Sequence, residues 1–149
     1  MRLHEYEAAD IFEKAGISVT NRCLVSTPTE AIKAAEEIGY PVVVKAQVLV
    51  GGRGKAGGIK TAHTPKELNA IVKALLESEI KELPVNNLLI SKKVTIVQEL
   101  YLGITIDSYR GKPVIVVSTK GGINIEETAA AAPENVTTLH MEPGEVLYP

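Results

Sequence analysis

Apolar residues at the start of the chain recur at the three- and four-residue spacing of an α-helix. They predict a first helix over residues 3–15, ending before Gly16, a residue type favoured just beyond a helix. Residues 27–30 and 64–67 each combine a threonine N-cap, a proline at the first helical position and a glutamate at the third. These two signals predict a second helix, ending at Gly39, and a third helix.

Short aliphatic and β-branched runs lie between the predicted helices. Each is too short for a helix and is typical of a buried strand. The predicted strands are residues 23–25, 42–44, 59–62 and 88–90.

The last third of the chain has a different period. From residue 94 to 107 apolar side chains occupy alternate positions, which predicts one long strand with an apolar and a polar face. A turn over residues 107–112 then leads into a strand at 114–117, forming a hairpin. We expect a helix over residues 125–132 and a last strand over 136–141.

Helices alternate with strands up to about residue 90, and the hairpin dominates the remainder. This order predicts an α/β or α+β fold with a mixed sheet and flanking helices. The proline-containing link at residues 83–87 is the expected subdomain joint.

The composition describes a folded, aliphatic-rich chain of 149 residues with 45% hydrophobic residues and a net charge of −2. Such a charge argues against nucleic acid as the main partner. No apolar run reaches the ~18 residues of a membrane span, and the charged N-terminus lacks the apolar core of a signal peptide. We expect a cytoplasmic protein, or one of the mitochondrial matrix if a presequence has been removed. Cys23, the single cysteine, is expected to be a small buried side chain.

Five of the twelve glycines lie in residues 51–58, where they alternate with Arg53 and Lys55. We name this stretch the glycine segment. Glycines let backbone N–H groups approach an anion, and the cations add positive charge. The glycine segment therefore predicts a phosphate-binding loop, with Lys45 just upstream, in preference to a flexible turn or linker.

Two common phosphate loops do not match the glycine segment. The G-x-G-x-x-G spacing of residues 52–57 requires a helix to begin inside the motif, whereas residues 59–61 are strand-like. A Walker A loop needs Ser or Thr after its lysine, and Ala56 stands there. The remaining interpretation is a glycine-rich flap between two antiparallel strands that folds over the phosphates of a nucleotide.

Five motifs occur in order along the chain: LHEYEA at 3–8, VVKAQ at 43–47, GGRGKAGG at 51–58, ELYLG at 99–103 and STKGG at 118–122. Together they resemble the β subunits of succinyl-CoA synthetases (succinate–CoA ligases), which are ATP-grasp ligases. The resemblance covers nearly the whole chain and implies the N-terminal portion of an ATP-grasp fold. It also implies a reaction of the tricarboxylic acid cycle, in which an acyl-CoA is formed from an acid, CoA and ATP or GTP through a phosphohistidine. ADP or GDP and phosphate are released.

The resemblance assigns nucleotide-binding roles to particular residues. Lys45 and Arg53 would contact the phosphates, with Gly52 and Gly54 donating backbone N–H groups. Glu99 would bind the ribose hydroxyls.

The base would lie against backbone groups of Val94, in the linker-like residues 91–95. Ser91 and Lys55 are further candidates for nucleotide binding. The family often has an acid where this chain has Ser91-Lys92-Lys93. This departure leaves the choice between ATP and GTP open.

The family's β subunit is far longer than this chain. The resemblance places the second half of the ATP-grasp domain, with Asn and Asp ligands for Mg²⁺, and a CoA-ligase domain outside these residues. The phosphohistidine and the CoA site would belong to a partner α subunit. We therefore expect no catalytic or metal-binding residue here, and exposed or packing roles for His4, His63 and His140. By itself the chain is expected to be inactive.

Three other interpretations remain open or are disfavoured. The chain could be a stand-alone nucleotide-binding module that regulates or completes a partner. It could also belong to a malate-type CoA ligase β subunit. An RNA-binding Gly-Arg loop is disfavoured because no aromatic platform accompanies the glycine segment.

Overall fold

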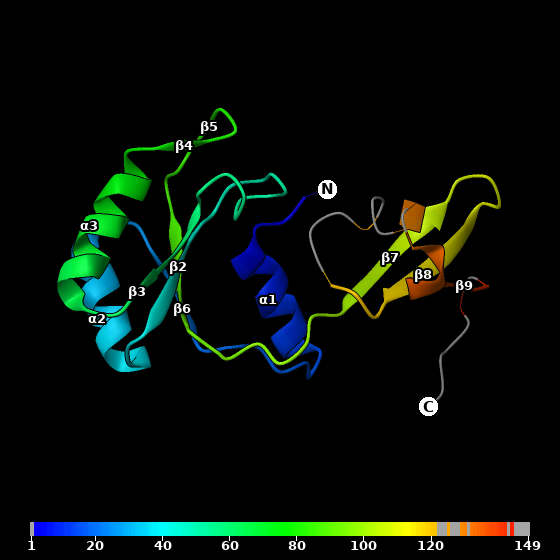
Figure 1. Cartoon of the computed structure of the whole chain (residues 1–149), viewed down its shortest axis with the longest axis horizontal. Coiled ribbons are helices and arrows are strands. Elements are labelled where there is room, and N and C mark those ends of the chain that lie inside the picture. Colours follow the sequence, from blue (N-terminus) through cyan, green and yellow to red (C-terminus); the bar gives the residue numbers. More distant parts are fainter. Residues whose placement is uncertain (1, 122–124, 126–128, 131, 143, 145–149) are drawn as a thin grey trace. The chain divides into compact units, whose positions relative to one another are not determined.

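The computed structural model describes residues 2–121, 125, 129–130, 132–142 and 144. The chain divides into two compact units, residues 1–94 and 95–149, and each is described by itself (Figure 1). The division falls after Val94, whereas the expected joint at residues 83–87 lies inside the first unit. Among the described residues, no helix is long and apolar enough to cross a membrane.

The first unit contains three helices and six strands among its described residues. In chain order they are α1 (Glu5–Lys14), β1 (Arg22–Val25), α2 (Pro28–Ile38), β2 (Val42–Ala46), β3 (Ile59–Ala62), α3 (Pro65–Leu76), β4 (Glu79–Ile80), β5 (Leu83–Pro84) and β6 (Leu88–Lys92).

The helix starts follow the local signals of the sequence. The side chains of Thr27 and Thr64 accept hydrogen bonds of 3.2 Å from the backbone N–H groups of Glu30 and Glu67. Each bond satisfies a donor that the first helical turn would otherwise leave unpaired. The predictions for α2 and α3 are therefore confirmed.

Four strands form one sheet in the order β1-β6-β2-β3. Every pairing in it is antiparallel, so the prediction of a mixed sheet was wrong. The reason is that α3 and the β4–β5 hairpin return the chain, so that β6 enters between β1 and β2 running opposite to both. Helices α2 and α3 lie on one side of this sheet and α1 on the other (Figure 1). The core lies under α2 and α3; its largest fully buried aliphatic side chains are Leu68, Leu88, Ile90, Val42, Val44, Val72 and Val85.

Helix α1 differs from α2 and α3 because none of its residues is fully buried. Its polar side chains attach it to the rest of the unit. Arg22 of β1 donates to Asp10 at 2.6 Å and to Glu13 at 3.0 Å. Glu5, at the start of α1, makes two more ion pairs, which are described below.

The second unit contains a three-stranded antiparallel sheet in the order β7-β8-β9. These strands are β7 (Tyr101–Asp107), β8 (Lys112–Ser118) and β9 (Val136–His140), and a short 3₁₀ helix, η1 (Pro133–Asn135), precedes β9. The prediction of a strand from residue 94 was wrong over residues 94–100. The ladder begins where Tyr101 pairs with Ser118, and residues 94–100 have no described partner strand. The helix predicted over residues 125–132 lies partly outside the described residues.

One face of β7 is apolar and open. Leu102, Ile104 and Ile106 are 71%, 72% and 63% exposed.

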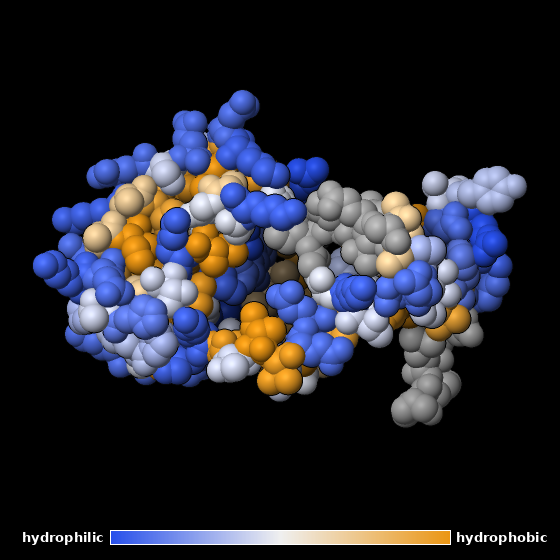
Figure 2. Space-filling view, viewed as in Figure 1, coloured by the Kyte–Doolittle hydropathy of each residue, from blue (hydrophilic) through white to orange (hydrophobic). Residues whose placement is uncertain are grey.

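Cys23, in β1 of the first unit, is exposed, so the expectation that it is buried was wrong. In the first unit, hydrophilic side chains line the outer edge around α2, α3 and the β4–β5 hairpin, and hydrophobic side chains show between them on the side drawn in Figure 2.

Candidate functional site

The alternation of β2 directs Lys45 away from the main core. Val42, Val44 and Ala46 are buried, whereas Val43 and Lys45 between them are only partly buried. In a strand, successive side chains point to opposite faces of the sheet. Lys45 therefore points to the side of the sheet on which α1 lies.

Glu5 joins Lys45 to the glycine segment. One carboxylate oxygen, Oε1, lies 2.7 Å from Lys45 Nζ, and Oε2 lies 2.7 Å from Arg53 Nη2. All three side chains are largely withdrawn from water, with exposed fractions of 30% for Glu5, 25% for Lys45 and 17% for Arg53. Two cations predicted to bind phosphate thus share one anion in this structure.

The ionisation of Glu5 follows from its partners. Burial by itself raises the pKa of the Glu5 carboxyl, but the hydrogen bonds and positive charges of Lys45 and Arg53 outweigh this effect and lower it. The carboxylate is therefore the stable form at neutral pH.

The glycine segment is a bonded turn and not a loose linker. Arg53 donates to the carbonyl of Ala46 at 2.6 Å, and the Gly58 N–H donates to the carbonyl of Arg53 at 2.8 Å. The Ala56 N–H in turn donates to the carbonyl of Gly52 at 3.1 Å. Strands β2 and β3 on either side pair antiparallel, so the predicted strand-loop-strand flap is confirmed.

The backbone N–H groups of residues 51–55 in the glycine segment have no acceptor within the described part of the chain, and they include the two predicted to bind phosphate, those of Gly52 and Gly54. Gly52 has a φ of +72°, a conformation that side-chain-bearing residues rarely adopt. An oxygen-rich anion could accept hydrogen bonds from both donors without obstruction by a side chain.

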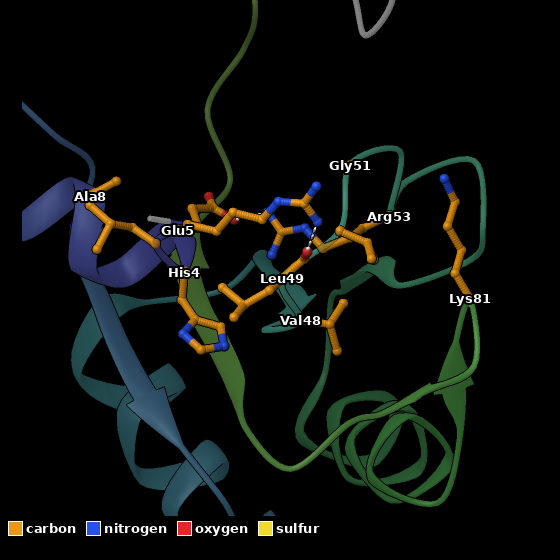
Figure 3. Close-up of a pocket in the computed structure, with 11 residues that line it drawn as sticks. His4, Glu5, Ala8, Val48, Leu49, Gly51, Arg53 and Lys81 are labelled. Carbon is orange, nitrogen blue, oxygen red and sulfur yellow. Dashed lines mark hydrogen bonds and ion pairs between the residues drawn. The ribbon is translucent and has the colours of Figure 1, made fainter.

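A cavity of about 650 Å³ opens beside this arrangement. Figure 3 shows its wall formed by the start of α1, residues 48–51, Arg53 and Lys81. Among the described residues of the lining, Arg2, Arg53 and Lys81 are cationic and Glu5 is the one acid. The cavity therefore suits an anionic ligand.

The other predicted residues lie in different settings. Ser91 belongs to β6 and is buried, not part of a linker, and it lines a second cavity together with Lys45. Lys55 is exposed on the glycine segment, and Val94 is exposed at the end of the first unit. Glu99 belongs to the second unit, where it precedes β7 instead of lying within a strand.

Two of the three histidines, His4 and His63, lie in the kind of position that was expected from the sequence, and His140 does not. His4 is the N-cap of α1, and its backbone N–H donates to Glu7 Oε2 at 2.7 Å. His63 is exposed. His140 instead makes a specific contact, because its Nε2 lies 2.8 Å from Asp107 Oδ2.

Asp107 begins the turn predicted over residues 107–112 and accepts hydrogen bonds from the backbone N–H groups of Tyr109 and Arg110. Across the described residues, no three His, Cys, Asp or Glu side chains are grouped so as to hold a metal ion.

Three charged residues at the site, Arg2, Glu5 and Lys81, were not predicted. Glu5 lies in the LHEYEA motif at residues 3–8, but the local periodicity indicated only the start of a helix there. Lys81 lies in a two-residue turn that carries no glycine or asparagine, the usual sequence signal for such a turn.

The chain is similar to known proteins over nearly its whole length. A family model described as "ATP-grasp domain" matches residues 2–149. The chain is 46% identical over 149 residues to succinate–CoA ligase [ADP-forming] subunit beta from Natronomonas pharaonis, and equally to that from Haloarcula marismortui. These matches cover all of this chain and 39% of each relative. The chain thus spans well under half the length of these relatives.

Solved structures share the fold. A protein from Pyrococcus horikoshii matches with a TM-score of 0.74 and 25% identity, over 93% of this chain and 58% of that one. A Ca. Korarchaeum cryptofilum protein, solved in complex with coenzyme A, matches with a TM-score of 0.70 and 26% identity. That match covers 93% of this chain and 59% of the other.

Proposed function

Because the chain belongs to the ATP-grasp family, we propose that it forms the nucleotide-binding part of an acid–CoA ligase β subunit. The complete enzyme would form succinyl-CoA from succinate, CoA and ATP or GTP. Its partner would be an α subunit with the phosphohistidine and the CoA site, and Mg²⁺ would be bound outside these residues. The similarity to succinate–CoA ligase β subunits supports this choice of acid.

One observation above all supports nucleotide binding by this part. Glu5 brings together Lys45 and Arg53, and Arg53 stands between Gly52 and Gly54, whose backbone N–H groups have no acceptor among the described residues. A polyphosphate needs several positive charges and N–H donors converging on one place. The positive charges of Lys45 and Arg53 would offset the negative charge of the nucleotide and the charge that develops during phosphoryl transfer.

The remaining roles follow from the resemblance. Val94 would offer backbone groups to the base, and Glu99 would bind the ribose hydroxyls. Ser91 and Lys55 are lesser candidates, because Ser91 is buried in β6 and Lys55 is exposed with no described partner.

Calorimetric titration of the complete β subunit with ATP and with GTP, in the presence of Mg²⁺, tests the proposal. We expect saturable binding, and a loss of affinity of roughly 10- to 100-fold in Lys45→Ala and in Arg53→Ala, since hydrogen bonds to charged groups contribute about 1.5–3 kcal/mol. Lys66→Ala is the matched control, because Lys66 is an exposed lysine of α3 that does not line either cavity. If both site variants bind nucleotide as tightly as the unaltered chain, the assignment is wrong.

The activity of the complete enzyme is a separate measurement. The β subunit assembled with its α partner should convert succinate, CoA and nucleotide to succinyl-CoA, nucleoside diphosphate and phosphate. Acyl-CoA formation from malate but not from succinate would reject succinate as the substrate.

A further inference from the structure

The β4–β5 hairpin has an unusual turn. Glu79 pairs with Pro84 and Ile80 with Leu83, so that Lys81 and Glu82 alone form the connection. Both have positive φ angles, +51° and +67°. A two-residue turn of this kind favours Asn-Gly, because side-chain-bearing residues other than Asn and Asp are strained there.

The hairpin is firmly anchored on both sides of this turn. Ile80 and Val85 are buried, and the Val85 N–H donates to the carbonyl of Ser78 at 3.2 Å. Ile80 also packs against the glycine segment, where a Cβ added at Gly58 would lie 3.2 Å from Ile80 Cδ1. The turn is thereby fixed beside the glycine segment, and its strained residues are held in place by their neighbours.

Lys81 extends from this turn along the glycine segment (Figure 3). A Cβ added at Gly52 would lie 3.3 Å from Lys81 Nζ, so the ammonium group lies over the backbone of Gly52. Within the described residues Lys81 has no ion pair or hydrogen bond. The cation is close to a backbone that offers unpaired N–H donors, and no acid neutralises it.

The Lys81 ammonium group lines the same cavity as Arg53, which is proposed to bind phosphate. Arg53 lines this cavity with Lys81 and shares Glu5 with Lys45. The cationic groups therefore continue from Lys45 through Arg53 to Lys81. Backbone strain that persists next to a ligand cavity is a recurrent property of functional positions.

We propose that Lys81 is a further phosphate-binding residue, which contacts the polyphosphate of the bound nucleoside triphosphate from the side of the β4–β5 hairpin. This inference rests on the proposed nucleotide-binding function. It adds a third cation to Lys45 and Arg53 and gives the hairpin turn a role in ligand binding.

Calorimetric titration of the complete β subunit with ATP, and separately with inorganic tripolyphosphate, in the presence of Mg²⁺ tests the role of Lys81. Lys81→Ala should weaken the binding of both ligands about tenfold, whereas Lys81→Arg, which keeps the charge, should stay within about twofold. The matched control is again Lys66→Ala, which removes the same charge away from the cavity and should stay within about twofold. Equal losses in Lys81→Ala and Lys66→Ala would reduce the effect to net charge and overturn the proposal.

A glycine substitution separates ligand binding from folding. Lys81→Gly removes the cation and also relieves the positive φ, so we expect weaker ATP binding together with a higher Tm. A loss of binding in Lys81→Ala accompanied by a collapse of Tm, with normal binding in Lys81→Gly, would show that Lys81 acts only on the fold.

The outcomes also distinguish this proposal from the one on which it rests. If ATP binds and Lys45→Ala weakens it while Lys81→Ala binds within about twofold of the unaltered chain, only the role of Lys81 is rejected. If the complete, unaltered β subunit binds neither ATP nor tripolyphosphate in the presence of Mg²⁺, both proposals are rejected.

Discussion

The carboxylate of Glu5 lies 2.7 Å from the guanidinium of Arg53, a residue 48 positions further along the chain. The same carboxylate reaches Lys45 through its other oxygen. Without Glu5, two cations would face each other with no neutralising charge between them.

Glu5→Gln should therefore destabilise the first unit. We expect the free energy of unfolding at neutral pH to fall by about 1 kcal/mol, since the triad is partly exposed and water screens its charges. Urea denaturation measures this change. Glu37→Gln is the matched control, because Glu37 is exposed on α2 and has no described partner, and it should change stability by less than about 0.5 kcal/mol. Equal stability of Glu5→Gln and the control would contradict the expected contribution.

The contribution of Glu5 should also depend on pH. Folding lowers the pKa of Glu5, so the stabilisation is complete above the ordinary value of 4.5 and is lost as the pH falls through the lowered native value. The difference in unfolding free energy between the unaltered chain and Glu5→Gln should thus be larger at about pH 7 than at about pH 3. A difference that stays constant over this range would argue that Glu5 acts through its shape and not through its charge.

Thr27→Ala should destabilise α2. The substitution leaves the Glu30 N–H without its side-chain acceptor, which costs about 1 kcal/mol for a typical N-cap. Thermal or urea unfolding is the measurement, and Thr27→Ser, which retains the hydroxyl, is the control. Equal stability of the alanine and serine variants would mean that the cap contributes nothing.

Leu68 and Ile104 should respond in opposite ways to truncation. Leu68 is fully buried in the core, so Leu68→Ala should cost about 2–5 kcal/mol of unfolding free energy. Ile104 is 72% exposed, and Ile104→Ala should change stability by less than about 1 kcal/mol. A cost at Ile104 as large as that at Leu68 would show that another part of the protein covers the face of β7.

His140→Ala should raise the pKa of Asp107. The hydrogen bond from His140 is the main cause that lowers this pKa, followed by the backbone N–H of Arg110. The variant should therefore move the pKa of Asp107 toward its ordinary value but not restore it fully, because the backbone donors remain. NMR titration of the Asp107 side-chain carboxyl carbon measures the change, and an unchanged pKa would rule out the His140 contact in solution.

The sequence predicted the parts of the fold that depend on neighbouring residues. The threonine caps of α2 and α3 and the glycine-rich flap each need only a few consecutive positions. The sequence did not predict where β7 begins, because the start of the strand depends on the backbone pairing of Tyr101 with Ser118 in β8.

For the candidate site, local patterns identified Lys45 and Arg53 but not what holds them together. Glu5 lies 40 and 48 positions away from these cations, and helical periodicity accounts for it without any distant contact. The sequence also did not predict the role of Lys81, because Lys81 and Glu82 form a two-residue turn whose sequence such turns disfavour. Its position depends on Ile80 packing against Gly58, a long-range contact.

The weak burial of α1 has a consequence for how the site behaves in different buffers. The helix is attached by charge, through Glu5, Asp10 and Glu13, while the core beneath α2 and α3 is apolar. Dissolved ions shorten the reach of partly exposed charges from about 8 Å at physiological ionic strength to about 3 Å in molar salt, but they do not weaken apolar packing in the same way. Concentrated salt should therefore loosen α1 before the sheet unfolds, and so release Lys45 and Arg53 from the carboxylate that they share.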